Sequence, residues 1–260
     1  MIELPFVSVS PTLLVAGTAA ALALGVAKVG FGGIGTIVAV PLVSLAAEPE
    51  RALAILLPLL LLADAIGVTS HRRSFDRRAV LQCVPGAALG VAAGGLLLAV
   101  VNGAWITVLV GALSVGFAVQ SFAGAGRPDG PTAAGSPRLA APFGMASGLT
   151  STLAHAGGPP IHVHLLSRGY APVVFVATSA VFMACVNLMK LVPYVWVGSF
   201  DASTLAVSAL LVPAAALGSF AGVALARRIS RRAFSITVNA AMLLIGLRLL
   251  WVGGRALLAG

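Results

Sequence analysis

The sequence has little charge. Only 9% of its 260 residues are Asp, Glu, Lys or Arg, while 59% are hydrophobic. A chain of this composition lacks the polar surface that a water-soluble globule needs, so we expect a membrane protein. It also has only two cysteines, Cys83 and Cys185, both in apolar stretches. This excludes a disulfide framework and favours small buried thiols.

Six apolar stretches are long enough to cross a hydrocarbon core, which takes about 17 to 25 helical residues. They are residues 52–70, 79–101, 104–122, 171–197, 202–226 and 233–252. Two further stretches, residues 12–46 and 139–167, are apolar but interrupted by glycine and proline. The N-terminus shows no basic region followed by a short apolar run and a cleavage site, so no removable signal peptide is predicted.

The chain carries an internal duplication. Residues 84–94 recur as residues 212–222, with eight of eleven positions identical. Gly-Gly at 32–33 and Ser-Phe-Asp at 74–76 recur 125 residues later, at 157–158 and 199–201. We therefore predict two membrane repeats, residues 1–122 and 139–260, joined by a cytoplasmic linker at 123–138. Duplicated apolar halves with broken helices are typical of secondary transporters.

The arginines predict how the halves are oriented. The loops at 71–78 and 227–232 hold eight of the fourteen arginines, and positive loops favour the cytoplasmic side. This explains the net charge of +9 better than nucleic-acid binding does. Eight full crossings would put the two loops on opposite faces, whereas re-entrant hairpins at the two broken stretches put both inside. A hairpin arm of about fourteen residues covers roughly 20 Å. The predicted fold is an all-α polytopic membrane protein with two inverted repeats, each a glycine-broken re-entrant hairpin plus three transmembrane helices.

The two glycine-rich breaks are the predicted anion site. Glycine and proline disfavour a helix interior, and each break is followed by a new helix whose N–H groups attract anions. The site residues predicted here are Gly32, Gly33, Gly35, Thr36, Gly157, Gly158 and Pro160. The alternative is that such glycines only allow close helix packing. We favour packing for Gly90, Gly94, Gly218 and Gly222.

The few polar residues inside the apolar stretches complete the predicted site. Lys28 and Lys190 are the only lysines, and a buried ammonium needs a partner or a cavity. Lys28 either faces the site or snorkels to the membrane surface. Lys190 either binds the anion or pairs with Asp64. Ser151, Thr152 and Asn187 are predicted to line the cavity, although serine and threonine often bond to their own helix.

Histidines offer a route for protons or a metal. His155 stands at the second break and titrates near neutral pH, so His155 or Asp64 is predicted to couple protons. His162 and His164 suggest a metal site and hence an intramembrane enzyme as the alternative function. Helical residues two apart point about 200° apart, which disfavours a shared metal, and no metal or other cofactor is predicted.

The ordered motifs resemble the TauE/SafE family of membrane anion transporters. The resemblance rests on Gly-x-Gly-Gly-x-Gly at 30–35 with Val40-Pro41, the basic loop at 71–78, Ala-Leu-Gly-x-x-Ala-Gly at 88–94 and Gly-Gly-Pro at 157–159. It implies export of sulfite or small organosulfonates, such as sulfoacetate, in bacteria that degrade sulfonates. The second break departs from the family's fuller glycine run, because Ala154-His155-Ala156 precede Gly157.

The predicted function is secondary transport of a small anion out of the cell by alternating access. The expected partners are the anion and the lipid bilayer of the bacterial inner membrane, with no nucleic acid, and a homodimer is compatible with the sequence. No nucleotide-binding motif indicates a primary pump. The sequence leaves open an importer of a related sulfur oxyanion or carboxylate, and an accessory membrane subunit without transport of its own.

Overall fold

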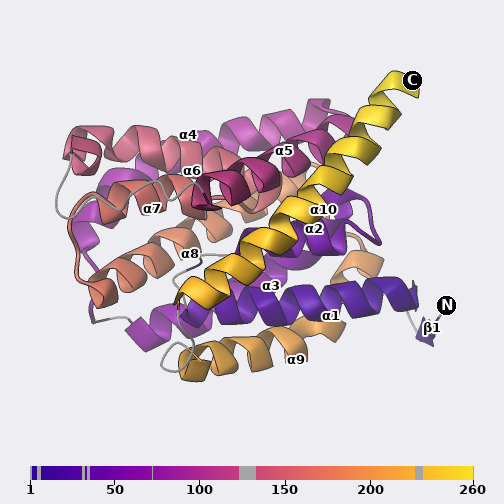
Figure 1. Cartoon of the computed structure of the whole chain (residues 1–260), viewed down its shortest axis with the longest axis horizontal. Coiled ribbons are helices and arrows are strands. Elements are labelled where there is room, and N and C mark those ends of the chain that lie inside the picture. The colour runs from indigo at the N-terminus through magenta and orange to yellow at the C-terminus, as the bar shows by residue number, and fades with distance from the viewer. Residues whose placement is uncertain are drawn as a thin grey trace.

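The computed structural model describes residues 2–4, 7–30, 33, 36–71, 73–122, 133–225 and 231–259. The described chain is nearly all helical (Figure 1). The exception is a pair of short antiparallel strands, β1 (Ile2–Leu4) and β2 (Val7–Val9). This hairpin differs from the all-helical prediction. Ile2, Val7 and Val9 are β-branched, and such residues favour extended backbone.

The helices follow the predicted stretches closely. The first half contains α1 (Pro11–Gly25), the π-helix η1 (Val26–Gly30), the 3-10 helix η2 (Thr36–Val38), α2 (Ala39–Val43), α3 (Pro49–His71), α4 (Arg77–Val100) and α5 (Gly103–Phe122). The second half contains η3 (Ala133–Gly135), η4 (Pro137–Leu139), α6 (Ala140–Ala154), α7 (Gly158–Leu166), α8 (Pro172–Trp196), α9 (Ala202–Leu225) and α10 (Arg231–Ala259). Most ends lie within three residues of the prediction, but α10 runs seven residues further.

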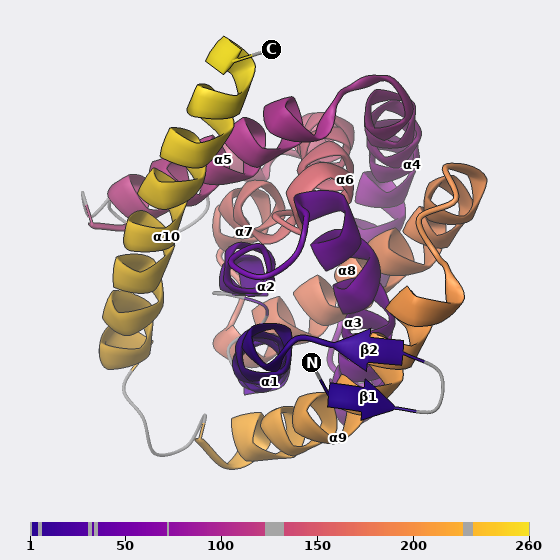
Figure 2. The same ribbon diagram turned by 90° about the vertical axis from the view of Figure 1, so that its right-hand side faces the viewer.

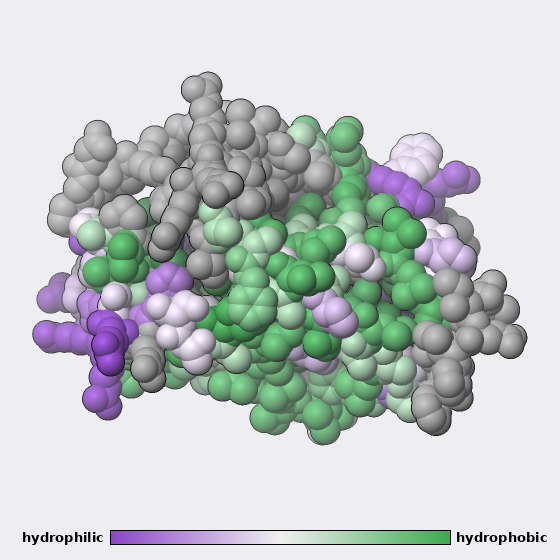
Figure 3. Space-filling model, turned by 90° about the horizontal axis from the view of Figure 1, so that it is seen from below, coloured by the Kyte–Doolittle hydropathy of each residue, from purple (hydrophilic) through white to green (hydrophobic). Residues whose placement is uncertain are grey.

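Among the residues described, five helices are long and apolar enough to cross a membrane. They are Pro11–Gly30, Pro49–His71, Arg77–Val100, Val173–Trp196 and Ala202–Gly222, with a shorter apolar helix at Gly103–Gly116. The first of these was predicted as one arm of a re-entrant hairpin, with a length of about fourteen residues for the arm. It has 20 residues instead, because η1 continues α1 up to Gly30. Figure 3 shows apolar side chains across the middle of one face, with hydrophilic groups toward both ends.

The duplicated motif packs each half against the other. α4 packs along α6, and α9 packs along α1 and η1. A Cβ on Gly90 would lie 2.1 Å from the Met145 carbonyl oxygen, and one on Gly218 would lie 2.4 Å from that of Leu22. Real Cβ atoms do not approach so closely, so only glycine fits there. Added Cβ atoms on Gly94 and Gly222 would also lie within 2.8 Å of the neighbouring helix, which confirms the packing role.

The centre of the molecule is α3, which packs against α8 and α9. Five of its large apolar side chains are at most 1% exposed, namely Leu53, Ile55, Leu56, Leu57 and Leu59. A helix that is apolar on every side is typical of a protein core or of a membrane span. In Figure 2, α3 lies next to α1, α8 and α9, whereas α8 also reaches the outer surface, where Leu188 and Val192 are exposed. The polar side chains Asp64 of α3 and Lys190 of α8 are buried and therefore kept away from lipid.

A polar network closes the end of the molecule at which α3 and α4 are joined. The Asp76 side chain caps α4 through the Ala79 N–H, at 3.0 Å, and accepts a hydrogen bond from the Tyr170 hydroxyl. Burial opposes ionisation of Asp76, but the hydrogen bonds from Tyr170 and from backbone N–H groups outweigh it and lower the pKa of Asp76. Burial and the Asp76 contact raise the pKa of Tyr170. The network thus ties the first basic loop to the α7–α8 loop.

Candidate functional site

Both predicted breaks are real interruptions of helix. α6 ends at Ala154, and His155 has φ 50° and ψ 28°, the only positive φ among the described residues other than glycine. α7 then begins at Gly158, with Pro159 and Pro160 in its first turn. A proline fits there because the first N–H groups of a helix have no helical acceptor. At the first break, helical structure ends at Gly30, and Gly33 has φ 85°.

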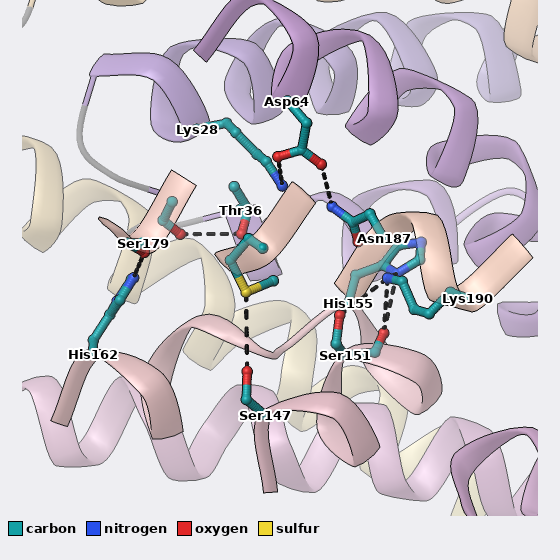
Figure 4. A network of polar contacts seen from close by, with 12 residues as sticks. Lys28, Thr36, Asp64, Ser147, Ser151, His155, His162, Ser179, Asn187 and Lys190 are labelled. Atoms are coloured by element: carbon teal, nitrogen blue, oxygen red, sulfur yellow. Dashed lines mark hydrogen bonds and ion pairs between the residues drawn. The ribbon is translucent and has the colours of Figure 1, made fainter. Parts of the chain in front are cut away.

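One small cavity lies between the two breaks. Lys28, Gly33 and Thr36 line it from the first break, and Gly158, His162, Ser179, Ala180 and Met183 line it from the second break and α8. Figure 4 shows Lys28, Thr36, Ser179 and His162 around this region. The cavity has room for about one water molecule. The cavity is therefore small, and polar side chains from both breaks and from α8 contribute to its lining.

Lys28 is held by an ion pair at the edge of the cavity. Its Nζ atom lies 2.9 Å from Oδ1 of Asp64, and the two side chains are 6% and 4% exposed. Asn187 Nδ2 donates to Asp64 Oδ2 at 2.6 Å. The pair joins η1 to α3, while Asn187 adds a contact from α8 (Figure 4). Lys28 does not snorkel, because Asp64 supplies its counter-charge inside the protein.

Lys190 is held by three acceptors instead of a carboxylate. Its Nζ atom lies 3.0 Å from Ser151 Oγ, 3.2 Å from the Ser151 carbonyl oxygen and 2.8 Å from His155 Nδ1. His155 Nε2 lies 2.9 Å from the Leu53 carbonyl oxygen, which can only accept. The neutral tautomer with the proton on Nε2 satisfies the contacts with Leu53 and Lys190, because Nδ1 then accepts from Lys190. Nδ1 also lies 3.2 Å from the Ser151 carbonyl oxygen, a longer contact that this tautomer leaves without a proton. The three N–H groups of the ammonium are fully used.

The structure brings together only part of the predicted set. Lys28, Gly33, Thr36 and Gly158 line the cavity, whereas Ser151, His155, Asn187, Lys190 and Asp64 form the network beside it. The alternative pairing of Lys190 with Asp64 is not present, since Lys28 holds Asp64. Gly32 and Gly35 lie outside the described residues.

Three predicted residues have structural contacts instead. Thr152 Oγ1 donates to the Gly148 carbonyl of its own helix at 2.9 Å, and the Gly157 carbonyl accepts from Ser147 Oγ at 2.6 Å. Pro160 lies in the first turn of α7 and is not among the residues that line the cavity. These positions support the second break without facing the cavity.

Sequence reasoning missed Ser179 and Met183 and did not include His162 among the residues that bind the anion. His162 Nε2 lies 2.9 Å from Ser179 Oγ, and both residues line the cavity. Ser179, Met183, Asn187 and Lys190 are spaced by four, four and three residues, which places them on one face of α8. This spacing was the available signal.

The histidine pair does not converge on one point. His164 Nδ1 lies 2.8 Å from the Ala134 carbonyl, and its Nε2 accepts from Arg168 Nε at 3.2 Å, whereas His162 contacts Ser179. No group of three or more His, Cys, Asp or Glu side chains with metal-binding geometry occurs within the described part of the chain. The two imidazoles therefore do not form a shared ligand set.

Apolar helices long enough to span a membrane, with a buried lysine at a small cavity between two helix breaks, are typical of a multi-pass membrane transporter. The family model described as Sulfite exporter TauE/SafE matches residues 17–249, nearly the whole chain. The protein therefore belongs to the TauE/SafE family, which is a family of transporters and not of enzymes. The resemblance to this family is confirmed. The alternative prediction of an intramembrane metalloenzyme does not agree with membership of a transporter family. No curated protein and no solved structure matches the chain significantly.

Proposed function

We propose that this protein exports a small sulfur oxyanion, sulfite or an organosulfonate such as sulfoacetate, across the bacterial inner membrane by alternating access. One observation carries the proposal. The same small cavity is lined by Lys28 and by residues of both helix breaks. Polar backbone and an ammonium are costly at membrane depth, and they recur there where a substrate is bound.

The charge balance of the site favours an anion. Lys28 and Lys190 bring two positive charges, and Asp64 brings one negative charge. All three side chains are at most 6% exposed. With each group ionised, the buried site carries one net positive charge. An anion with one negative charge neutralises this charge, whereas a cation would double it.

The cavity also offers hydrogen-bond donors that suit the oxygens of sulfite or a sulfonate. Lys28 Nζ, the hydroxyls of Thr36 and Ser179, and the His162 ring belong to lining residues. Pro159 and Pro160 have no N–H group, so the start of α7 supplies fewer backbone donors than predicted. Side chains thus contribute more to this site than backbone amides do. Because a sulfite ion is larger than one water molecule, the cavity must widen to admit it.

The proposed transport unit has two inverted halves. Reciprocal packing supports this, because α4 of the first half packs on α6 of the second, and α9 of the second half packs on α1 of the first. Two further pairs, α3 with α8 and α5 with α10, also join one half to the other. Both termini lie at the same end of the molecule (Figure 1). Hairpins formed by α1 with α2 and by α6 with α7 would enter from opposite faces. Rocking one half against the other would then expose the cavity to either side.

Proton coupling is assigned to Asp64 or His155. Asp64 is buried and shares Lys28 with any anion that enters the cavity, so substrate binding and its protonation are linked. His155 is bound through both ring nitrogens, to the carbonyls of Leu53 and Ser151 and to Lys190, so its protonation would be linked to Lys190. Asp64→Asn and His155→Gln variants separate these assignments, since the coupling residue is the one whose loss removes the effect of a pH gradient.

Flux into liposomes tests the proposal. Purified protein should transport radiolabelled sulfite or sulfoacetate faster than sulfate, and a pH gradient should change the rate. A Lys28→Met variant should lose most of this flux because it lacks the cation that lines the cavity. In liposomes that hold the protein in one known orientation, the direction in which the anion moves distinguishes export from import. The absence of flux for all three anions with correctly folded protein would favour an accessory subunit.

A further inference from the structure

We propose that Lys190 is a tethered cation that fills a monovalent-cation site at the C-terminal end of α6, in place of a bound coupling cation. Its ammonium would then support the second break without binding the transported anion. The role of Lys190 in transport rests on the proposed function. The existence of the cation site does not, because measurements of protein stability can test it separately.

The contacts of Lys190 describe a cation site. The ammonium is fully buried, with the side chain 0% exposed, and meets one carbonyl oxygen, one hydroxyl oxygen and one imidazole nitrogen. The carbonyl and hydroxyl oxygens each present a lone pair. The shorter contact of His155 Nε2 with the Leu53 carbonyl, 2.9 Å against 3.2 Å between Nδ1 and the Ser151 carbonyl, favours the tautomer in which Nδ1 is an acceptor. Three neutral acceptors facing one point bind a cation of about the size of ammonium. Within the described residues, no carboxylate forms an ion pair with Lys190.

The position in the fold explains the need for a cation. Ser151 lies in the last turn of α6, and its carbonyl belongs to the helix end that carries partial negative charge. In transporters with discontinuous helices, such C-terminal ends and unwound carbonyls coordinate the coupling cation. Here a side chain from α8 reaches the same kind of position. Since the lysine charge is covalently attached, no free metal cation is required.

His155 is specialised for this site. Its positive φ is a backbone conformation in which glycine is the usual residue, so a larger side chain there costs strain. Glycine would relieve the strain but would remove the acceptor that Lys190 meets at 2.8 Å. The ring also bridges α6 to the Leu53 carbonyl of α3. His155 therefore acts as a positioning residue for the tethered cation.

Lys190 is separate from the cavity that the anion would enter. The cavity is lined by Lys28, and Lys190 is not among its lining residues. Lys190 nevertheless stabilises the anion through space, because its charge is not paired by a carboxylate. The two lysines thus have different tasks: Lys28 contacts the substrate, and Lys190 replaces a resident cation.

Chemical rescue tests the inference. Lys190→Ala leaves space for methylammonium, whereas Lys190→Met fills the same space without charge. We expect both variants to exchange labelled sulfite at least about tenfold more slowly than wild type, because buried hydrogen bonds to a charged group are lost. Methylammonium should restore exchange and raise the unfolding temperature of Lys190→Ala but not of Lys190→Met. Exchange is measured at equal pH on both sides, so that amines cannot act by dissipating a pH gradient.

Each alternative result is decisive. The inference is overturned if Lys190→Ala exchanges sulfite at the wild-type rate without amine. It is also overturned if methylammonium leaves the unfolding temperature of folded Lys190→Ala unchanged. Wild-type protein whose flux requires Na⁺ or K⁺ overturns it as well. If Lys190→Ala folds poorly, it is purified in methylammonium throughout, and unfolding after removal of the amine supports the site. A wild type without any anion flux contradicts the proposed function, while the shift in unfolding temperature still reports on the cation site.

Discussion

At the scale of single residues, Thr36 and Thr152 form a matched pair. Both are buried threonines next to a break, yet Thr36 lines the cavity and the Thr152 hydroxyl bonds to Gly148 in its own helix. The Thr36 hydroxyl donates to the Gly33 carbonyl at 3.1 Å, from which it can turn toward an anion. The two threonines therefore separate substrate contact from structural support.

We predict that Thr36→Val raises the KM for sulfite by about fivefold, the effect of losing one hydrogen bond of about 1 kcal/mol. Thr152→Val should leave the KM unchanged, because its hydroxyl does not face the cavity. Initial rates of sulfite uptake over a range of concentrations measure both values. Equal KM values for Thr36→Val and wild type would remove Thr36 from the site.

The sequence identified the charged residues of the site better than its uncharged ones. Lys28, Lys190 and Asp64 stand out because ionised groups are rare in apolar stretches, and all three prove to be buried. Their partners were less predictable. Asp64 binds Lys28 and not Lys190, because pairing depends on how η1 and α8 approach α3, which local sequence does not encode. Ser179 was missed because serine is common and neutral in such helices.

At the scale of helices, the glycines of the duplicated motif set how closely the two halves pack. Gly90 of α4 faces α6, where a Cβ would meet the Met145 carbonyl at 2.1 Å. Gly116 of α5 offers a control, since a Cβ there has no atom within 4 Å. The two positions differ in packing but share the intrinsic helical preference of alanine over glycine.

We predict that Gly90→Ala destabilises the protein by about 1–3 kcal/mol, because α4 and α6 must separate to admit the methyl group. Gly116→Ala should be neutral or stabilising by up to about 1 kcal/mol, the helix-propensity gain alone. Thermal unfolding of the two variants in the same detergent measures the contrast. If Gly90→Ala unfolded at or above the wild-type temperature, close packing at this position would be disproved.

The helices and their breaks were both predicted well, because both depend on local features of the sequence. Long apolar runs and Gly-Pro interruptions are local signals, and α3, α4, α8 and α9 begin and end near the predicted residues. Features that depend on the surroundings were less predictable. The π-helix η1 extends the first arm beyond α1 to Gly30, the first glycine of the pattern, and no local sequence signal indicated this change in helix type. The partner of each duplicated motif also came only from the structure, because packing joins distant segments.

At the scale of the whole molecule, orientation in the membrane is the property that decides whether the halves are inverted. If both broken segments are re-entrant, the loops at 71–78 and 227–232 are cytoplasmic and the loop at 197–201 is external. Eight full crossings would instead put positions 75 and 199 on one face and position 230 on the other. The arginine distribution favours the first arrangement, because positive loops are retained in the cytoplasm.

We predict this topology for single cysteines placed in a background that lacks Cys83 and Cys185. Phe75→Cys and Ser230→Cys should react with a membrane-impermeant maleimide only in inverted vesicles, and Ser199→Cys only in intact spheroplasts. Denatured samples control for buried positions that fail to react on either side. Labelling of positions 75 and 199 from the same face would show that the second broken segment, residues 139–167, crosses the membrane, and the proposed pair of facing hairpins would have to be abandoned. Opposite faces for these two positions, with 230 on the side of 75, would show that residues 139–167 enter and leave the membrane by the same face, as the second hairpin of an inverted pair requires.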